Sequence, residues 1–122
     1  MDSNAVIDYL RSSLPATGMV FMNGVVNDIP KVSIVSKIEV LGFNTVPAAY
    51  KLLTDFFNDS LVLPLSDEVA ETTIDLRKKF KIKLPDAIVA ATAIAYNLTL
   101  ITRNTSDFQK ISDITCLDPH QI

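Results

Sequence analysis

The sequence predicts an α/β fold with a mostly parallel central sheet flanked by helices, formed by one domain over residues 1–122. Short apolar runs of strand length alternate with helical patterns along the chain, which is typical of parallel sheets with helical crossovers. The expected helix at 86–97 is also small and apolar nearly all round, as suits a helix packed inside against a sheet. In such sheets, ligands bind beyond the carboxyl ends of the strands, so polar residues at those ends are the functional candidates.

The expected strands are short and rich in Val, Ile, Leu and Thr, and they cover residues 32–36, 61–65, 98–102 and 114–117. Helices are expected at about 4–11, 15–27, 36–43, 48–58, 66–80 and 86–97. The helix at 66–80 has the clearest ends, because Ser66 is a good N-cap and the basic residues at 77–79 suit the negative end of the helix dipole.

Composition excludes several classes of protein. With 48% apolar and 20% charged residues, the chain is not disordered. The longest apolar run, 87–95, is half the length of about 18 residues that a membrane span needs. No signal peptide is visible, and a single cysteine, Cys116, excludes an internal disulfide, so we expect a cytoplasmic protein. No phosphate-cradling glycine motif is present. The net charge of −3 by itself argues against a nucleic-acid partner.

Four acidic residues lie at strand ends or helix starts beside apolar sequence, namely Asp2, Glu39, Asp86 and Asp107. They are far apart in the chain, so only the fold can bring them together. If it does, the cluster is unstable without cations, because each carboxylate raises the cost of ionising its neighbours. Mg²⁺ or Mn²⁺ would be the natural counterpart. A metal held this way can lower the pKa of a bound water and stabilise charge developing on a phosphoryl group.

Each of these acids also has a purely structural interpretation. Asp2 could cap the first helix, and Glu39 completes an S-x-x-E capping box with Ser36. Asp107 could belong to a short helix at 106–110, and Asp86 is a favourable acid in a first helical turn. Taken singly, none of the four is specific.

Three further features have a structural and a functional interpretation. A basic cluster precedes Asp86 and is either a solvated helix end or an RNA contact. The only histidine, His120, is expected at the surface, and Cys116 is expected to be a buried structural thiol. The basic cluster consists of Arg77, Lys78, Lys79, Lys81 and Lys83.

The order of motifs resembles the PIN-domain ribonucleases, specifically the VapC toxins of toxin–antitoxin pairs. DSNAVIDYL at 2–10 resembles the opening D-T-N motif of that family, and IEVLGF at 38–43 resembles its second-acid segment. The block at 76–111, LRKKFKIKLPDAIVAATAIAYNLTLITRNTSDFQKI, resembles the most recognisable stretch of the family, and ITCLDP at 114–119 also fits.

This resemblance implies a metal-dependent endoribonuclease that hydrolyses RNA phosphodiester bonds with Mg²⁺ or Mn²⁺. It further implies an RNA substrate, a small VapB-like antitoxin as cognate partner, and a homodimer. Carried over by motif, it makes Asp2, Glu39, Asp86 and Asp107 the catalytic and metal-site acids, with Asn4, Thr102 and Asn104 as supporting polar residues.

The sequence departs from the family pattern in two places. Asn104 stands where relatives often carry an aspartate, which shifts the fourth acidic role to Asp107. In the family a short apolar strand precedes the first aspartate, whereas here only Met1 precedes Asp2. We therefore expect the first strand to be truncated or missing. These departures keep open the alternative of a catalytically inactive PIN-like module that binds protein or RNA. A receiver-type signalling domain fits less well, because the closely spaced acid pair is absent.

The net charge is consistent with the metal-site interpretation. Without the four candidate acids, 11 basic residues face 10 acidic ones. The acidity is thus partly concentrated in one predicted site, where bound cations would neutralise it. We expect phosphate engagement to depend on metal.

Overall fold

The structure, a computed structural model, describes all residues from Met1 to Ile122. Seven helices and four short strands follow one another along the chain, with a pair of helices before each of the first three strands. None of the helices has the length and apolar character that a membrane span requires. The elements are α1 (Ser3–Leu10), α2 (Ala16–Asn27), β1 (Lys31–Ser33), α3 (Ile34–Leu41), α4 (Pro47–Asn58), β2 (Leu61–Leu63), α5 (Asp67–Lys79), α6 (Leu84–Ala95), β3 (Leu100–Ile101), α7 (Thr105–Phe108) and β4 (Cys116–Leu117).

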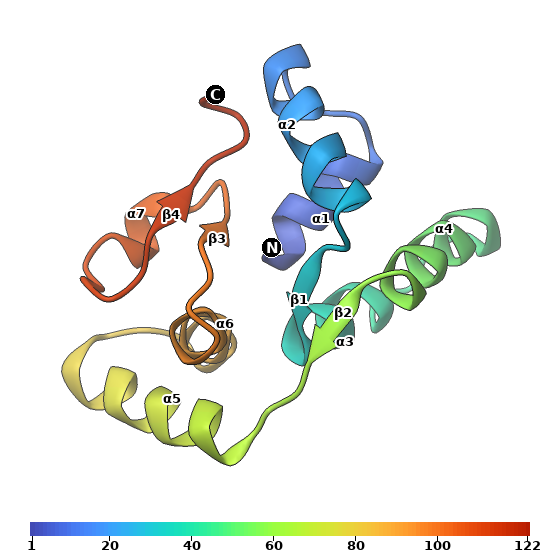
Figure 1. Cartoon of the computed structure of the whole chain (residues 1–122). Helices are drawn as coiled ribbons and strands as arrows, with labels where there is room; N and C mark the ends of the chain where they lie inside the picture. The colour runs from blue at the N-terminus through green and yellow to red at the C-terminus, as the bar shows by residue number, and fades with distance from the viewer.

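All strand pairing is parallel, which confirms the predicted α/β class. Strand β1 pairs with β2 in the register Val32 to Val62, and β3 pairs with β4 in the register Leu100 to Cys116. These are two separate two-stranded sheets rather than one continuous central sheet. Figure 1 shows the amino terminus between them, at the centre of the molecule. There the backbone amine of Met1 donates to Lys31 O (3.3 Å) and the amide of Asp2 donates to Ile101 O (3.1 Å).

The strands are shorter than the apolar runs predicted. The expected strand at 32–36 ends at Ser33, whose hydroxyl caps α3 by accepting from the amide of Val35 (3.2 Å). The apolar residues that follow Ser33 are helical, because an apolar run of this length suits a buried helix turn as well as a strand. Helix α5 agrees closely with its prediction, and the hydroxyl of Ser66 accepts from the amide of Val69 (3.2 Å).

Helix α6 is the interior helix that the sequence predicted. Its residues from Ala87 to Ala93 are all buried, and it packs closely on α5. Small side chains on several faces allow neighbouring elements to approach on more than one side. The helix begins at Leu84, two residues before the predicted start, because Pro85 suits the first turn. Asp86 therefore lies in the first turn of a buried helix.

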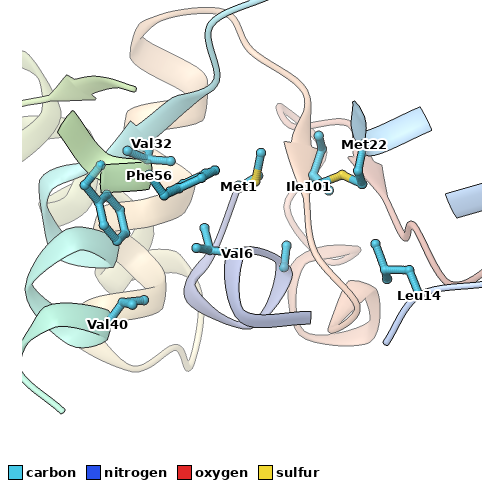
Figure 2. Packing of buried hydrophobic residues seen from close by; sticks show 10 residues of the cluster. Met1, Val6, Leu14, Met22, Val32, Val40, Phe56 and Ile101 are labelled. Atoms are coloured by element: carbon cyan, nitrogen blue, oxygen red, sulfur yellow. The ribbon is translucent and has the colours of Figure 1, made fainter. Parts of the chain in front are cut away.

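A second apolar cluster surrounds the amino terminus. Met1 lies between the side chains of Val32 on β1 and Phe56 on α4 on one side and that of Ile101 on β3 on the other (Figure 2). Phe56 and Phe57 meet edge to face, with ring centroids 5.4 Å apart. The first residue of the chain thus belongs to the core that joins the two sheets.

Two glycines of α2 provide a matched test of how the carboxyl-terminal tail packs. A Cβ at Gly18 would lie 2.1 Å from the carbonyl oxygen of Pro119, whereas a Cβ at Gly24 would meet nothing within 4 Å. We expect Gly18→Ala to lower the free energy of unfolding by about 1–3 kcal/mol through overpacking. Gly24→Ala should raise it by about 0.4–1 kcal/mol, because alanine restricts the unfolded chain. Urea denaturation measures both, and equal effects would contradict the packing described.

Candidate metal centre

The four candidate acids come from four different elements that meet at the carboxyl edge of the strands. Asp2 is the N-cap of α1, Asp86 lies in the first turn of α6, Glu39 lies on α3 after β1, and Asp107 lies on α7 after β3. Burial raises the pKa of Asp86, and the negative charges of Asp107, Glu39 and Asp2 raise it further. The fold therefore brings all four carboxylates close enough for three of them to act on the fourth.

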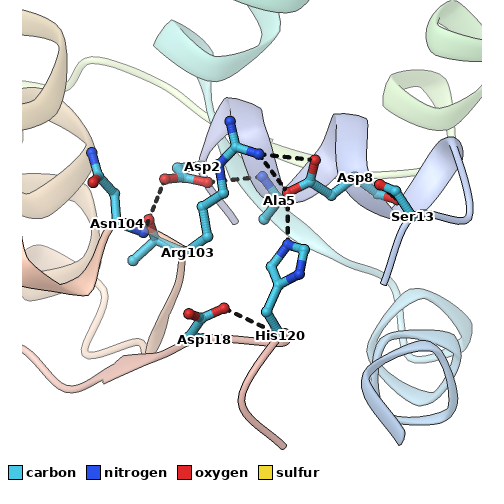
Figure 3. Close-up of polar contacts among 9 residues, drawn as sticks. Asp2, Ala5, Asp8, Ser13, Arg103, Asn104, Asp118 and His120 are labelled. Atoms are coloured by element: carbon cyan, nitrogen blue, oxygen red, sulfur yellow. Dashed lines mark hydrogen bonds and ion pairs between the residues drawn. The ribbon is translucent and has the colours of Figure 1, made fainter. Parts of the chain in front are cut away.

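Asp2 is the most firmly held of the four. Its Oδ1 accepts from the amide of Ala5 (3.0 Å), so it caps α1, and its Oδ2 accepts from the hydroxyl of Thr102 (Figure 3). Thr102 is fully buried and also accepts from the amide of Asn104 (3.0 Å). Burial raises the pKa of Asp2, while these hydrogen bonds and the charges of the amino terminus and Arg103 oppose the shift. Asp2 therefore caps α1, as its structural interpretation predicted. The same carboxylate also belongs to the acidic cluster.

Glu39 and Asp107 form the exposed rim of the cluster. Glu39 Oε1 accepts from the hydroxyl of Ser3 (2.8 Å), and Asp107 Oδ2 accepts from Asn104 Nδ2 (2.7 Å). The predicted capping box is wrong, because Ser33 rather than Ser36 caps α3, and Ser36 is buried inside the helix. Glu39 is thus free of a capping role and points its carboxylate toward α1.

The remaining predicted polar residues lie beside the acids. Thr102 and Asn104 are bonded to Asp2 and Asp107 respectively. Asn4 is half-buried in the first turn of α1 and lines a groove of about 420 Å³ with Ser3 and Glu39. Sequence reasoning did not predict a role for Ser3, although its place in the D-S-N motif is a signal that could have indicated one.

The four acidic side chains are chemically suited to bind a hard divalent cation. All four side chains offer carboxylate oxygens, and their mutual repulsion at Asp86 would be relieved by a bound cation. In their present positions, however, no three acidic, histidine or cysteine side chains are grouped closely enough to enclose one ion. A cation bound to these side chains as they stand would contact fewer than three of the carboxylates directly, with water completing its shell, as Mg²⁺ commonly allows.

An ionic cluster that the sequence did not predict lies behind Asp2. The buried carboxylate of Asp8 accepts from Arg103 Nη1, 3.3 Å from each of its oxygens, and from His120 Nε2 at 3.0 Å (Figure 3). His120, which was expected at the surface, is half-buried there and takes part in this cluster. Its side chain is 29% exposed and attaches the carboxyl-terminal tail to α1. The cluster also positions Arg103, whose charge acts on Asp2.

The basic cluster lies on the surface beside Asp86. The five basic residues are exposed on the last turn of α5 and the segment leading to α6, and the positive charge of Lys83 opposes the rise in the pKa of Asp86. Both the helix-end and the RNA-contact interpretation of this cluster stay open.

Cys116 is half-buried in β4, where burial and the charge of Asp2 raise the pKa of its thiol. A thiol with a raised pKa is a poor nucleophile at neutral pH.

The raised pKa of Asp86 has a consequence for stability in the absence of metal. A folded-state pKa above the ordinary value of 3.8 means that the folded state binds this proton more tightly than the unfolded chain. Stability is therefore lost as the pH rises from about 3.8 through the folded pKa. Because asparagine is neutral throughout, we expect the Tm of Asp86→Asn in EDTA to exceed that of the wild type by an amount that grows from pH 3.5 to pH 7. Exposed Asp75 on α5 provides the control variant, Asp75→Asn. A difference that stays constant or shrinks over this range would contradict the account.

The comparisons with known proteins agree with this class of fold and site. The family model for the PIN domain matches residues 24–114. A toxin–antitoxin complex from Klebsiella pneumoniae contains a chain 30% identical to this one, with a TM-score of 0.75, and the match covers 99% of this chain and 97% of that chain. DNA-bound VapBC from Salmonella typhimurium matches at 20% identity and a TM-score of 0.79, over 97% and 95% of the two chains. FitAcB from Neisseria gonorrhoeae matches at 19% identity and a TM-score of 0.79, over 99% and 97%. No curated protein matches the sequence.

The fold and the site define a parallel α/β protein with an acidic cluster at the carboxyl edge of its strands. The family model covers most of the chain, and a relative at 30% identity covers nearly all of it. The chain belongs to the PIN-domain family, which confirms the resemblance found in the sequence.

Proposed function

We propose that this protein is a metal-dependent endoribonuclease and the toxin component of a cytoplasmic VapBC-type toxin–antitoxin pair. The single observation that carries the enzymatic proposal is the convergence of the four carboxylates, three of which raise the pKa of the fourth. Such a concentration of like charge destabilises the apo protein and is typical of a functional site. PIN-domain membership and the likeness to a chain of a toxin–antitoxin complex support the same conclusion.

In this proposal, Asp86 and Asp2 hold Mg²⁺ or Mn²⁺ at the recessed end of the cluster, and Glu39 and Asp107 serve at its rim. When bound, the metal would supply an activated water and neutralise charge on the scissile phosphate. Three polar side chains hold the carboxylates of the site in position. Thr102 fixes one oxygen of Asp2, Asn104 fixes Asp107, and Ser3 fixes Glu39. Lys83 and its basic neighbours lie beside Asp86 and are suited to contact the RNA backbone.

The experiment that tests the proposal is cleavage of a set of structured and single-stranded RNAs by the purified chain. We expect cleavage with Mg²⁺ or Mn²⁺ and none in EDTA. Binding of a non-cleavable RNA analogue should also require the metal, because without it the acidic cluster repels phosphate. Cleavage that persists in EDTA, or tight RNA binding by the apo protein, would contradict the proposal.

The proposed antitoxin partner has a suitable surface beside the acids. The groove lined by Asn4 and Glu39 continues along α1, α3 and α4. Apolar side chains stand exposed on this side, including Phe43, which is 75% exposed and lines the groove, and nearby Val46 and Leu52. Exposed apolar groups next to a functional site are typical of a protein interface. Co-expression with the product of a short neighbouring reading frame should yield a complex in which RNA cleavage is blocked.

We also propose that the protein forms a homodimer, which analytical ultracentrifugation of the purified chain would test.

A second candidate function is a PIN-like module that binds protein or RNA without catalysis. Two observations favour it, namely that no three ligand side chains are grouped closely enough to enclose an ion and that Asn104 stands in place of an acid. The two candidates predict different results for Asp86→Asn. If wild type and this variant are equally inert on every RNA with both metals, the non-catalytic function is the better account.

A further inference from the structure

The guanidinium of Arg103 lies at the edge of the acidic cluster, where a ligand can reach it. The side chain of Arg103 is 50% exposed. It lines the groove of about 420 Å³ that Ser3, Asn4 and Glu39 also line. Its positive charge acts on Asp2. A cation therefore stands in the same groove as one of the acids and beside another.

The backbone on both sides of Arg103 is tied to the site. Thr102 donates its hydroxyl to Asp2 and accepts from the amide of Asn104 (3.0 Å). Asn104 in turn donates from Nδ2 to Asp107 (2.7 Å). The residues that flank Arg103 are thus bonded to two of the acids, so its backbone has a fixed place relative to them.

Asp8 holds the guanidinium by one nitrogen only. Arg103 Nη1 lies 3.3 Å from each carboxylate oxygen of Asp8. A bidentate pair uses two nitrogens instead, and charge-assisted hydrogen bonds are typically about 2.7–2.9 Å long. The other N–H donors of this guanidinium have no hydrogen-bond partner in the protein. A planar fork with free donors matches the geometry of a phosphate group.

The carboxyl-terminal tail holds Asp8 from the other side. His120 Nε2 lies 3.0 Å from Asp8 Oδ2, and Asp8 is buried on α1 (Figure 3). The tail is itself fixed, because the amide of His120 donates to Asp118 Oδ1 (2.8 Å) and the hydroxyl of Thr17 donates to Ile122 O (2.5 Å). The position of this carboxylate, and of the guanidinium that it holds, therefore depends on the tail.

We propose that Arg103 is a phosphate-binding residue of the RNA site, and that Asp8 and His120 are its positioning residues. The free donors of the guanidinium bind the non-bridging oxygens of an RNA phosphate, while Asp8 keeps the guanidinium at the groove. This inference rests on the proposed function. It adds a phosphate contact beside Asp2, whereas the basic cluster lies beside Asp86.

The test is the salt dependence of binding to a fluorescent single-stranded RNA of about twelve nucleotides, at saturating Mn²⁺ and with phosphorothioate linkages that resist hydrolysis. Loss of one phosphate contact on a single strand reduces the slope of log affinity against log salt by about 0.7 in magnitude. We expect this smaller slope for Arg103→Gln, together with binding about tenfold weaker or more at low salt. Arg103→Lys keeps the charge and should keep the slope, although it binds less tightly because it lacks the fork. Lys51→Gln makes the same charge change on an exposed face of α4 and should alter neither quantity.

A double variant separates phosphate binding from a purely structural role. Asp8→Asn combined with Arg103→Gln removes both charges of the pair, so it should regain most of the Tm that Arg103→Gln alone loses. RNA binding should stay as weak as in Arg103→Gln. Recovery of binding together with stability would overturn the proposal, because Arg103 would then serve only to neutralise Asp8.

The positioning role is tested at His120. His120→Ala should weaken binding of the same RNA, and His120→Gln, which keeps a hydrogen-bond donor near Asp8, should restore most of the affinity. Equal affinity in His120→Ala and the wild type would overturn the positioning part of the proposal.

Failure of this inference and failure of the proposed function give different results. A wild type that neither cleaves nor binds RNA contradicts both. If the wild type cleaves RNA while Arg103→Gln binds the phosphorothioate RNA with unchanged affinity and slope, this inference alone is overturned.

Discussion

Asp86→Asn is expected to lower metal-dependent RNA cleavage by more than about a hundredfold. Loss of a hydrogen-bond partner of a metal ligand typically costs about 10–100-fold in metal affinity or activity, and loss of the ligand itself should cost more. Asp86 is the carboxylate on which the other three acids act, so its removal takes away the centre of the proposed site. The measurement is the single-turnover cleavage rate at saturating Mn²⁺, alongside Mn²⁺ affinity by titration calorimetry.

The same variant should fold at least as well as the wild type, since it removes a carboxylate whose ionised form the fold disfavours. Asp75→Asn serves as the matched control, because it makes the same change on an exposed face of α5. Added Mn²⁺ should raise the Tm of the wild type and of Asp75→Asn but not that of Asp86→Asn. Retained cleavage in Asp86→Asn would remove this residue from the site, whereas a lower Tm in EDTA would contradict the electrostatic argument.

Thr102→Val is expected to weaken Mn²⁺ binding by about 10–100-fold, although Thr102 is not itself one of the proposed metal ligands. Thr102 is fully buried, and its hydroxyl donates to Asp2 Oδ2 while it accepts from the amide of Asn104. The nearly isosteric valine removes both contacts. Asp2 is then left in a buried position with one donor fewer, so its pKa rises further and its carboxylate is less well oriented.

Two further variants separate this positioning role from a general loss of packing. Thr102→Ser restores the hydroxyl and should recover most of the Mn²⁺ affinity. Thr73→Val removes a buried hydroxyl from α5, where it donates to Val69 O (2.7 Å), and should leave the affinity unchanged. The pH at which Mn²⁺ binding is half-maximal should move upward in Thr102→Val only. If all three threonine variants bind Mn²⁺ equally, Thr102 has no role in positioning Asp2.

The sequence was sufficient for the parallel α/β class because short apolar runs recur between helical patterns along the chain and the helix α6 is apolar nearly all round. At the residues around Ser33, the sequence pattern does not decide between a strand and a helix. The run VSIVS suits a strand over its whole length, but the hydroxyl of Ser33 caps a helix that begins immediately after it. The competition between a strand and a capped helix is decided by how α3 packs, which periodicity does not contain. The capping box assigned to Ser36 was wrong for the same reason.

For the site, the pattern of acids at strand ends located four carboxylates that the fold brings together, and their role as metal ligands stays a prediction. The cluster of Asp8, Arg103 and His120 could not be predicted, because Asp8 is separated from its partners by 95 and 112 residues. Asp8 alone is an ordinary acid on an amphipathic helix. Only the three-dimensional path of the carboxyl-terminal tail places His120 beside it.

The central claim is that Asp2, Glu39, Asp86 and Asp107 together form one divalent-cation site. Anomalous X-ray diffraction from crystals of the wild-type protein soaked in Mn²⁺ tests it most directly. We expect an anomalous peak among these four side chains, with carboxylate oxygens of Asp86 and Asp2 in direct contact with the ion, and no such peak in Asp86→Asn. A peak elsewhere in the molecule, or none in protein that cleaves RNA with Mn²⁺ in solution, would contradict it.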